Sequence, residues 1–169
     1  MKTLFTAHEI AERVAVMGRE IRDFYQAKPL TLLVIANGAL FFGADLARAI
    51  NLPLWIDVLP AGSYAGQRST GKVRLRGEPK LPVAGRHLLL VDEVLDTGIT
   101  LRALGEHFAD AGALSVRNAV MVTKKCPRPD GVARADWSGF DAPDLYLVGY
   151  GMDSDEEFRN LPDIGYLEA

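Results

Sequence analysis

The sequence lacks the features of several specialised protein classes. Its single cysteine, Cys126, cannot form a disulfide within the chain of 169 residues, which is typical of a reducing cytoplasm. No apolar run approaches the ~18 residues that span a bilayer, and Glu9 and Glu12 interrupt the segment where a signal peptide would be apolar. Lys and Arg number 19 against 22 Asp and Glu, so no basic surplus favours nucleic acid. We therefore expect a cytoplasmic protein without membrane or nucleic-acid partners.

The composition that remains is that of an ordinary globular protein. Hydrophobic residues make up 49% of the chain and charged residues 24%. A chain of this length forms one domain that buries roughly 70% of the surface exposed by the unfolded chain. There are no internal repeats or low-complexity tracts. We therefore expect a single domain over residues 1–169.

Apolar stretches alternate with helical patterns between about residues 31 and 123. Short apolar runs that predict strands occur at Thr31–Ala36, Leu54–Val58, Leu88–Val91 and Arg117–Thr123. This alternation predicts an α/β fold with a doubly wound parallel sheet. A helix is expected to begin near Ala7, with Thr6 and Glu9 forming a capping box. Its apolar stripe is expected at Ile10, Val14, Met17, Ile21 and Phe24.

The ends of the chain lie outside this alternating pattern. We expect the first helix and the C-terminal tail to fold together as a small hood over the carboxyl edge of the sheet. The predicted core then covers about residues 30–135, and the predicted hood about residues 1–29 and 136–169.

The most informative stretch runs from Leu88 to Leu101. Four apolar residues predict a central strand buried on both faces, and the acids Asp92 and Glu93 follow directly. Open α/β sheets bind ligands at the carboxyl ends of their strands. The turn at Asp96–Thr100, two residues further on, can aim backbone N–H groups, two hydroxyls and a helix N-terminus at one point, which suits a phosphate. Acids beside a phosphate cradle predict a site for a phosphorylated sugar.

Simpler interpretations of these short motifs stay open. An acidic pair after a strand is also typical of a solvated turn, and a generic Asp-Thr-Gly is more often a turn with a helix cap. Asn37-Gly38 after the first strand indicates either a second anion site or a plain turn. Lys124 at a strand end either donates to a ligand carbonyl or is a surface lysine. The small, polar loop over about residues 60–76 is either a connection or a mobile lid.

The segment Val91–Thr100 resembles the phosphoribosyl-pyrophosphate (PRPP) motif of type I phosphoribosyltransferases, and other segments resemble the hypoxanthine-guanine branch. The resemblance implies a Rossmann-like core with a small hood. It implies transfer of the 5-phosphoribosyl group from PRPP to N9 of a 6-oxopurine, hypoxanthine or guanine, giving IMP or GMP and pyrophosphate in purine salvage. It also implies Mg²⁺ as the cofactor and a homo-oligomer, either a dimer or a tetramer.

The resemblance assigns roles within the motif. Asp92 and Glu93 would hold the ribose hydroxyls, directly or through a Mg²⁺-linked network. Asp96 would be the catalytic residue, accepting or steadying the proton at N7 of the purine as N9 attacks. The residues that would grip the 5′-phosphate are Thr97, Gly98, Ile99 and Thr100.

Further roles are implied outside the motif. Asn37, Gly38 and Arg159 would bind pyrophosphate, although Asn37 stands where the family often has Lys. The purine would meet three residues: Lys124 at its 6-oxo group, the Tyr146 ring by stacking, and the Leu147 backbone at the ring edge. The remaining assignments are Asp153 near a second Mg²⁺, Ser63 and Tyr64 in the mobile loop, and Leu145 as a departure from the Lys of some members.

Other functions remain possible from the sequence. The acceptor would instead be xanthine or another base if the protein recognises the edge of the purine that carries the 2-substituent differently. A non-catalytic regulator that senses PRPP would need an added nucleic-acid module, for which the chain has no spare length or basic run. A receiver-like signalling domain would carry its acids near the first strand. No Gly-x-Gly-x-x-Gly follows a strand, which argues against a dinucleotide-binding protein.

Overall fold

The structure is a computed structural model that describes residues 1–60, 77–132 and 134–168. The predicted mobile loop, about residues 60–76, therefore lies outside the described residues except for Pro60, and so do its members Ser63 and Tyr64. Helix α1 (Ala7–Tyr25) begins where the sequence predicts it. The Thr6 hydroxyl accepts from the Glu9 N–H, and the Glu9 carboxylate accepts from the Thr6 N–H at 2.8 Å. No described helix is both long and apolar enough to cross a membrane.

The buried face of α1 differs from the prediction at its last turn. Ile21 and the preceding members of the apolar stripe are buried as expected, but Tyr25 continues the stripe in place of Phe24. Phe24 is 40% exposed, and the Lys28 ammonium lies 4.5 Å from its ring centroid. Positions three and four residues after Ile21 both lie near one helix face, so the spacing alone does not choose between them.

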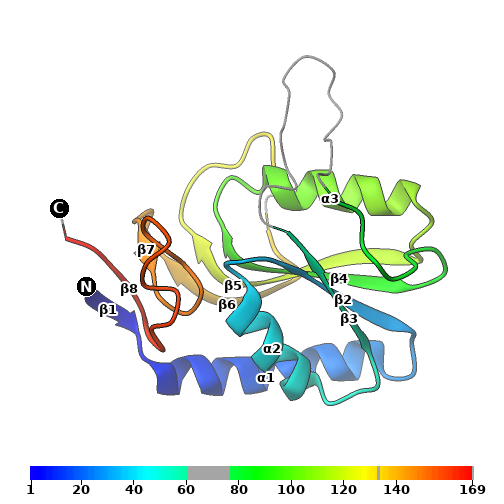
Figure 1. The fold of residues 1–169 in the computed structure, drawn as a ribbon, viewed down its shortest axis with the longest axis horizontal. Helices are drawn as coiled ribbons and strands as arrows, with labels where there is room; N and C mark the ends of the chain where they lie inside the picture. Colours follow the sequence, from blue (N-terminus) through cyan, green and yellow to red (C-terminus); the bar gives the residue numbers. More distant parts are fainter. Residues whose placement is uncertain (61–76, 133, 169) are drawn as a thin grey trace.

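The main sheet has five parallel strands in the order β3-β2-β4-β5-β6. Its strands are β2 (Leu30–Ile35), β3 (Trp55–Leu59), β4 (His87–Leu95), β5 (Ser115–Lys124) and β6 (Trp137–Ala142), and its crossover helices are α2 (Leu40–Ile50) and α3 (Ile99–Asp110). Figure 1 shows α1 and α2 below the sheet and α3 above it. The predicted doubly wound parallel fold is confirmed.

Side chains of the central strands alternate between two apolar cores. Leu89 and Val91 pack in the core between the sheet and helices α1 and α2, whereas Leu88 and Leu90 pack in the core between the sheet and α3. All four are almost fully buried. Burial on both faces explains why the strand sequence is continuously apolar instead of alternating.

A second, small sheet joins the two ends of the chain. Its antiparallel strands are β1 (Lys2–Phe5), β8 (Ile164–Tyr166) and β7 (Leu147–Val148), in the order β1-β8-β7. We call this the hood sheet, and Figure 1 shows it at one end of the main sheet. Helix α1 and strand β6 instead pack in the layers of the main sheet. The predicted residue limits of core and hood stay a prediction.

The strand order reverses at the centre of the main sheet. The connection from β2 leads to β3 on one side, and the connection from β4 leads to β5 on the other side. Between β2 and β4 the two connections leave in opposite directions, which opens a crevice at the carboxyl ends of these strands. Asn37-Gly38 follows the end of β2, and Asp92 and Glu93 lie within the last four residues of β4.

Two helical glycines give a matched test of this packing. A Cβ built on Gly18 of α1 would lie 2.5 Å from the Cβ of Ala49 and 2.6 Å from its backbone carbon, whereas a Cβ on Gly105 of α3 meets nothing within 4 Å. We expect Gly18→Ala to lower the free energy of unfolding by about 1–3 kcal/mol, because α1 and α2 must separate. Gly105→Ala should raise it by about 0.5–1 kcal/mol through helix propensity alone. Urea unfolding of both variants measures the two effects, and equal shifts would contradict the close packing.

Candidate active site

Two adjacent acids lie near the carboxyl end of β4. Asp92 is only 9% exposed, and Glu93 is half-buried. Burial raises the pKa of the Asp92 carboxyl well above its usual range, and the neighbouring Glu93 carboxylate raises it further. The Glu93 N–H donates to Asp92 at 3.1 Å, which opposes this rise only in part. A buried carboxyl at the edge of a crevice is typical of a functional site.

The loop after β2 lies against these acids. A Cβ built on Gly38 would overlap the Glu93 carboxylate, and a Cβ built on Gly151 would overlap the Gly38 carbonyl. The peptide bond between Ala36 and Asn37 is cis. The turn after β2 therefore lies against the Glu93 side chain and against the backbone of Gly151. Only glycine fits at position 151, where φ is +104° and a Cβ would meet the Gly38 backbone, whereas a side chain at position 38 would displace the Glu93 carboxylate.

The motif after β4 forms an open helix N-terminus. Gly98 has φ +71°, a conformation that favours glycine, and a Cβ there would also lie 2.5 Å from the Val132 carbonyl oxygen. Gly98 is the N-cap of α3, and no side chain among the described residues caps that helix. The amides of the first turn are therefore free of a capping side chain, as an anion site at a helix N-terminus requires.

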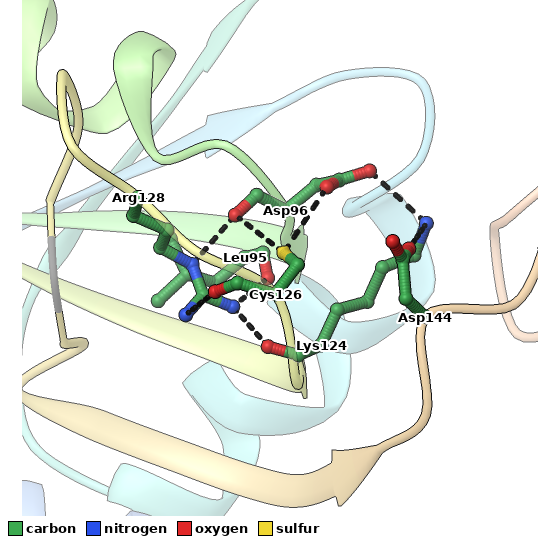
Figure 2. A network of polar contacts seen from close by, with 6 residues as sticks. All are labelled: Leu95, Asp96, Lys124, Cys126, Arg128 and Asp144. Carbon is green, nitrogen blue, oxygen red and sulfur yellow. Dashed lines mark hydrogen bonds and ion pairs between the residues drawn. The ribbon is translucent and has the colours of Figure 1, made fainter.

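Lys124 lies between two carboxylates (Figure 2). Its Nζ is 3.0 Å from Asp96 Oδ2 and 3.5 Å from Asp144 Oδ1, and its side chain is 13% exposed. Burial alone would lower the pKa of Lys124, but the hydrogen bonds and charges of Asp96 and then Asp144 outweigh it and raise the pKa. The ammonium is therefore fully charged at neutral pH and stands as a fixed donor beside Asp96.

A cavity of ≈220 Å³ brings most of the predicted base and sugar residues together. Its lining residues are Glu93, Val94, Asp96, Lys124, Tyr146, Leu147, Met152 and Asp153. Leu147 is buried in β7, whereas Tyr146 is 62% exposed. The volume lies below the roughly 300–1,000 Å³ of pockets for drug-sized ligands, which favours one small, flat ligand such as a heterocyclic base.

A second cavity, of ≈640 Å³, joins two of the three residues predicted to contact pyrophosphate, and Gly38 is not part of its lining. Asn37 and Arg159 both line it, together with exposed Phe41. Arg159 Nη2 lies 2.8 Å from Asp153 Oδ1 and 2.9 Å from Glu156 Oε2. Its guanidinium is thus held by two carboxylates at the rim of the cavity.

Two residues of this network are absent from the sequence-based prediction. Asp144 follows Pro143 and Arg128 follows Pro127, so in the sequence each resembles an ordinary polar residue of a turn. Nothing in the local pattern indicates that Asp144 reaches Lys124 or that Arg128 donates to the Asp96 carbonyl at 2.6 Å. Their contacts link segments that are distant in the sequence, so a local pattern cannot reveal them.

Known proteins share both the sequence and the fold. The family model described as "Phosphoribosyl transferase domain" matches residues 1–155. The chain belongs to this family. The hypoxanthine-guanine phosphoribosyltransferase of Mycobacterium avium is 37% identical over 98% of this chain and 84% of its own length, and the hypoxanthine-guanine-xanthine phosphoribosyltransferase of Tritrichomonas foetus is 29% identical over 99% and 91%.

A solved structure agrees with these relatives. The hypoxanthine phosphoribosyltransferase of Staphylococcus aureus superposes with a TM-score of 0.90 at 31% identity, covering 99% of this chain and 91% of its own. The resemblance predicted from the PRPP motif is confirmed, and the chain is a phosphoribosyltransferase. The roles of individual site residues stay predictions.

The acids of this phosphoribosyltransferase do not form a metal cage by themselves. Within residues 1–60, 77–132 and 134–168, no group of three or more His, Cys, Asp or Glu side chains could hold a metal ion. Mg²⁺ commonly keeps several waters and binds through one or two carboxylates and substrate phosphates. The half-buried Asp153, with Glu93 in the same cavity, fits that mode of binding.

The buried Asp92 predicts an unusual dependence of stability on pH. Below the unfolded-state pKa of about 3.9, Asp92 is protonated in both states and has no effect. As pH rises above this value, the unfolded chain releases the proton and the folded chain retains it, so wild-type stability falls until pH passes the folded pKa. Asp92→Asn removes this loss. We expect the free energy of unfolding of the variant, relative to wild type, to increase from pH 4 to pH 7.

Denaturant unfolding at several pH values measures this difference. Asp141→Asn is the matched control, because the Asp141 carboxyl is exposed on β6. Its curve should run parallel to that of wild type. If the curve of Asp92→Asn also ran parallel to that of wild type, Asp92 would have the same pKa in the folded and unfolded states, which would contradict the prediction.

Proposed function

We propose that this phosphoribosyltransferase moves the 5-phosphoribosyl group of PRPP to N9 of a 6-oxopurine, hypoxanthine or guanine, and releases pyrophosphate. One observation carries the proposal: the cavity of ≈220 Å³ joins Asp96, Lys124 and Tyr146 beside Glu93. A purine base and its ribose require four kinds of group. In this cavity Asp96 would be the proton acceptor, Lys124 the cationic donor, Tyr146 the aromatic ring, and Glu93 the acid that binds the sugar. The names of the relatives from Mycobacterium avium and Staphylococcus aureus support the same purines.

The phosphates of PRPP meet two helix N-termini in this proposal. The 5′-phosphate binds the uncapped first turn of α3, with hydrogen bonds from the amides and hydroxyls of Thr97–Thr100. The pyrophosphate group binds the Asn37-Gly38 turn before α2, whose N-terminus also has no side-chain cap, and Arg159 at the rim of the cavity. Asn37 brings no charge, so the backbone amides contribute more of the attraction.

The base is recognised at the edge that carries its 6-oxo group and N7. Lys124 donates to the oxo oxygen, while Asp96 accepts the proton of N7, and the free protein already holds these two side chains 3.0 Å apart. Tyr146 stacks on the ring, and the Leu147 backbone contacts the far edge. Adenine presents an amino donor to the Lys124 ammonium, which leaves two donors opposed.

The reaction breaks the bond between C1′ and the pyrophosphate oxygen and forms the bond between C1′ and N9. Positive charge develops on the ribose, where Asp92 and Glu93 hold the hydroxyls, and Asp96 takes the N7 proton as N9 becomes bonded. A positioned acid or base contributes typically about 10²–10⁴-fold to rate. Donors aimed at the pyrophosphate stabilise the charge that it gains.

Mg²⁺ fits the leaving-group side of the site. Asp153 would hold it together with oxygens of pyrophosphate and water, and the ion would neutralise charge on the leaving group. Asp92 and Glu93 would meet a second ion through the ribose hydroxyls. Assembly into a dimer or tetramer and residence in the cytoplasm stay predictions.

Xanthine is the second candidate acceptor, because the relative from Tritrichomonas foetus includes xanthine in its name. The 2-oxo group of xanthine would lie toward the Leu147 backbone. Leu145 offers an apolar side chain where some members have Lys. A regulator that binds PRPP without turnover is the remaining alternative, and a rate measurement separates it from an enzyme.

A purine panel tests the proposal. With PRPP and Mg²⁺, pyrophosphate release should be fast with hypoxanthine or guanine and about 5- to 150-fold slower with adenine, because an unpaired buried donor costs roughly 1–3 kcal/mol. Lys124→Gln should reduce the preference for hypoxanthine over adenine in kcat/KM by about 5- to 150-fold, the equivalent of that energy, since an amide can accept from the 6-amino group.

The neighbouring Lys125→Gln is the control, because Lys125 is exposed and lies outside the lining of the cavity. It should retain the wild-type preference. Absence of pyrophosphate release with every purine would overturn the enzymatic proposal, and release with xanthine alone would replace the acceptor.

A second variant isolates the proton acceptor. We expect Asp96→Asn to lower kcat by about 10²–10⁴-fold, because an amide cannot take the N7 proton. PRPP binding measured by calorimetry should remain, since the phosphates meet backbone amides of the next turn. Asp110→Asn, an exposed acid at the end of α3, is the control and should keep full turnover. Unchanged kcat in Asp96→Asn would remove Asp96 from the mechanism.

A further inference from the structure

Arg128 lies four residues after Lys124, and its guanidinium reaches back between the ends of β4 and β5 (Figure 2). Nε donates to the carbonyl of Asp96 at 2.6 Å, and Nη2 donates to the carbonyls of Leu95 at 3.0 Å and of Lys124. Nη1 donates to the carbonyl of Cys126 at 3.2 Å. One side chain thus bonds the backbone of both segments that carry Asp96 and Lys124.

The position of these carbonyls explains why a side-chain donor is needed. The last paired residues of β4 and β5 are Leu95 and Thr123. Beyond this pair, the chain after β4 turns into α3 and the chain after β5 turns toward Cys126, so the two backbones no longer hydrogen-bond each other as strands. A buried carbonyl left without a donor costs roughly 1–3 kcal/mol, and Arg128 supplies donors to both sides of the gap.

These hydrogen bonds depend on the planar geometry of the guanidinium and not on its charge. None of the ion pairs among the described residues includes Arg128. Its described acceptors are all neutral backbone oxygens. A guanidinium offers five N–H donors in one rigid plane, whereas a lysine ammonium is a compact point charge on a flexible stem. Lysine at this position would keep the charge and lose the planar set of bonds.

We propose that Arg128 is a positioning residue that fixes the distance between the Asp96 carboxylate and the Lys124 ammonium. The inference rests on the proposed function, in which the base meets Asp96 at N7 and Lys124 at its 6-oxo group simultaneously. The direct bond between these two side chains cannot keep their spacing once each turns to the base. The bonds of Arg128 end on the backbone and stay in place when the base binds.

The spacing matters because both contacts are made to one rigid ring. If the ends of β4 and β5 separate, a base that is held at its oxo group presents N7 too far from Asp96. A displacement of about 1 Å of a reacting group costs on the order of 10²-fold in rate. The Cys126 thiol also reaches the Asp96 carbonyl, at 3.5 Å, but a thiol is a weak donor.

Arg128→Lys tests the inference. We expect kcat with hypoxanthine to fall by about 10- to 100-fold, while KM for PRPP changes by less than about threefold, because an interaction that aligns the transition state lowers kcat and not substrate binding. Arg102→Lys is the matched control: Arg102 is exposed on α3, and its one ion pair with a described residue is with Glu106, at 3.9 Å. The control should keep the wild-type kcat.

A double-mutant cycle with Asp96→Asn separates positioning from general support of the fold. If Arg128 acts through Asp96, Arg128→Lys should lower kcat by no more than about threefold in the Asp96→Asn background. Equal losses in both backgrounds would overturn the inference, and so would an Arg128→Lys variant with wild-type kcat.

Rates are expressed per PRPP-binding site counted by calorimetry, so that unfolded protein does not enter the comparison. If Arg128→Lys does not fold, the same cycle and the same criteria apply to Arg128→Gln, which retains two planar N–H donors. A wild-type protein without turnover would overturn the proposed function. A fully active Arg128→Lys beside an active wild type would overturn only the role of Arg128.

Discussion

The close approach of Gly38 to the Glu93 carboxylate is the contact on which the rest of the site depends. It fixes the β2–α2 turn against the end of β4 at the point where the strand order reverses. On its other side, the Gly38 carbonyl meets Gly151, which belongs to the chain that leads into the hood sheet. A side chain at Gly151 would push its segment away from Gly38, and a side chain at Gly38 would displace the Glu93 carboxylate. These contacts therefore place Asp92 and Glu93, the turn at Asn37 and the hood side by side.

A second tie holds the hood against the same part of the main sheet. The Tyr150 hydroxyl donates to Asp45 of α2 at 2.8 Å, next in sequence to the contact at Gly151. Because α2 begins directly after the Gly38 turn, the helix transmits the position of the hood to the proposed pyrophosphate turn. Proposed substrate contacts that lie more than a hundred residues apart in the sequence are in this way held near one another.

The burial of Asp92 lowers the stability of the folded chain, and apolar packing elsewhere in the fold offsets this loss. A carboxyl that is 9% exposed beside another acid destabilises the folded chain at neutral pH, as its raised pKa indicates. The strand that carries it begins with Leu88–Val91, which are buried in two separate apolar cores. Local conflicts of this kind are expected at functional sites, where a residue is kept for its chemistry and not for stability.

Sequence patterns predicted the features that depend on near neighbours in the chain. The capping box of α1, the apolar run of β4 and the glycine of the open α3 N-terminus are each contained in a few residues. Strand β6 was not predicted, because Trp-Ser-Gly-Phe-Asp-Ala lacks an apolar run and pairs only with β5 at the sheet edge. The pairing of β1 with β8 and the contacts of Arg128 join distant segments, so no local pattern encodes them.

Because the cations at the carboxyl edge are already paired with carboxylates, the proposed reaction depends more on a divalent ion to neutralise the negative charge of the substrate. Lys124 is balanced by Asp96 and Asp144, and Arg159 is held by two carboxylates. Asn37 adds no positive charge where the family often has Lys. PRPP brings several negative charges to an edge where these cations are already paired. Its pyrophosphate must then be neutralised chiefly by backbone amides, by exchange of Arg159 from its carboxylates, and by the divalent ion that arrives with the substrate.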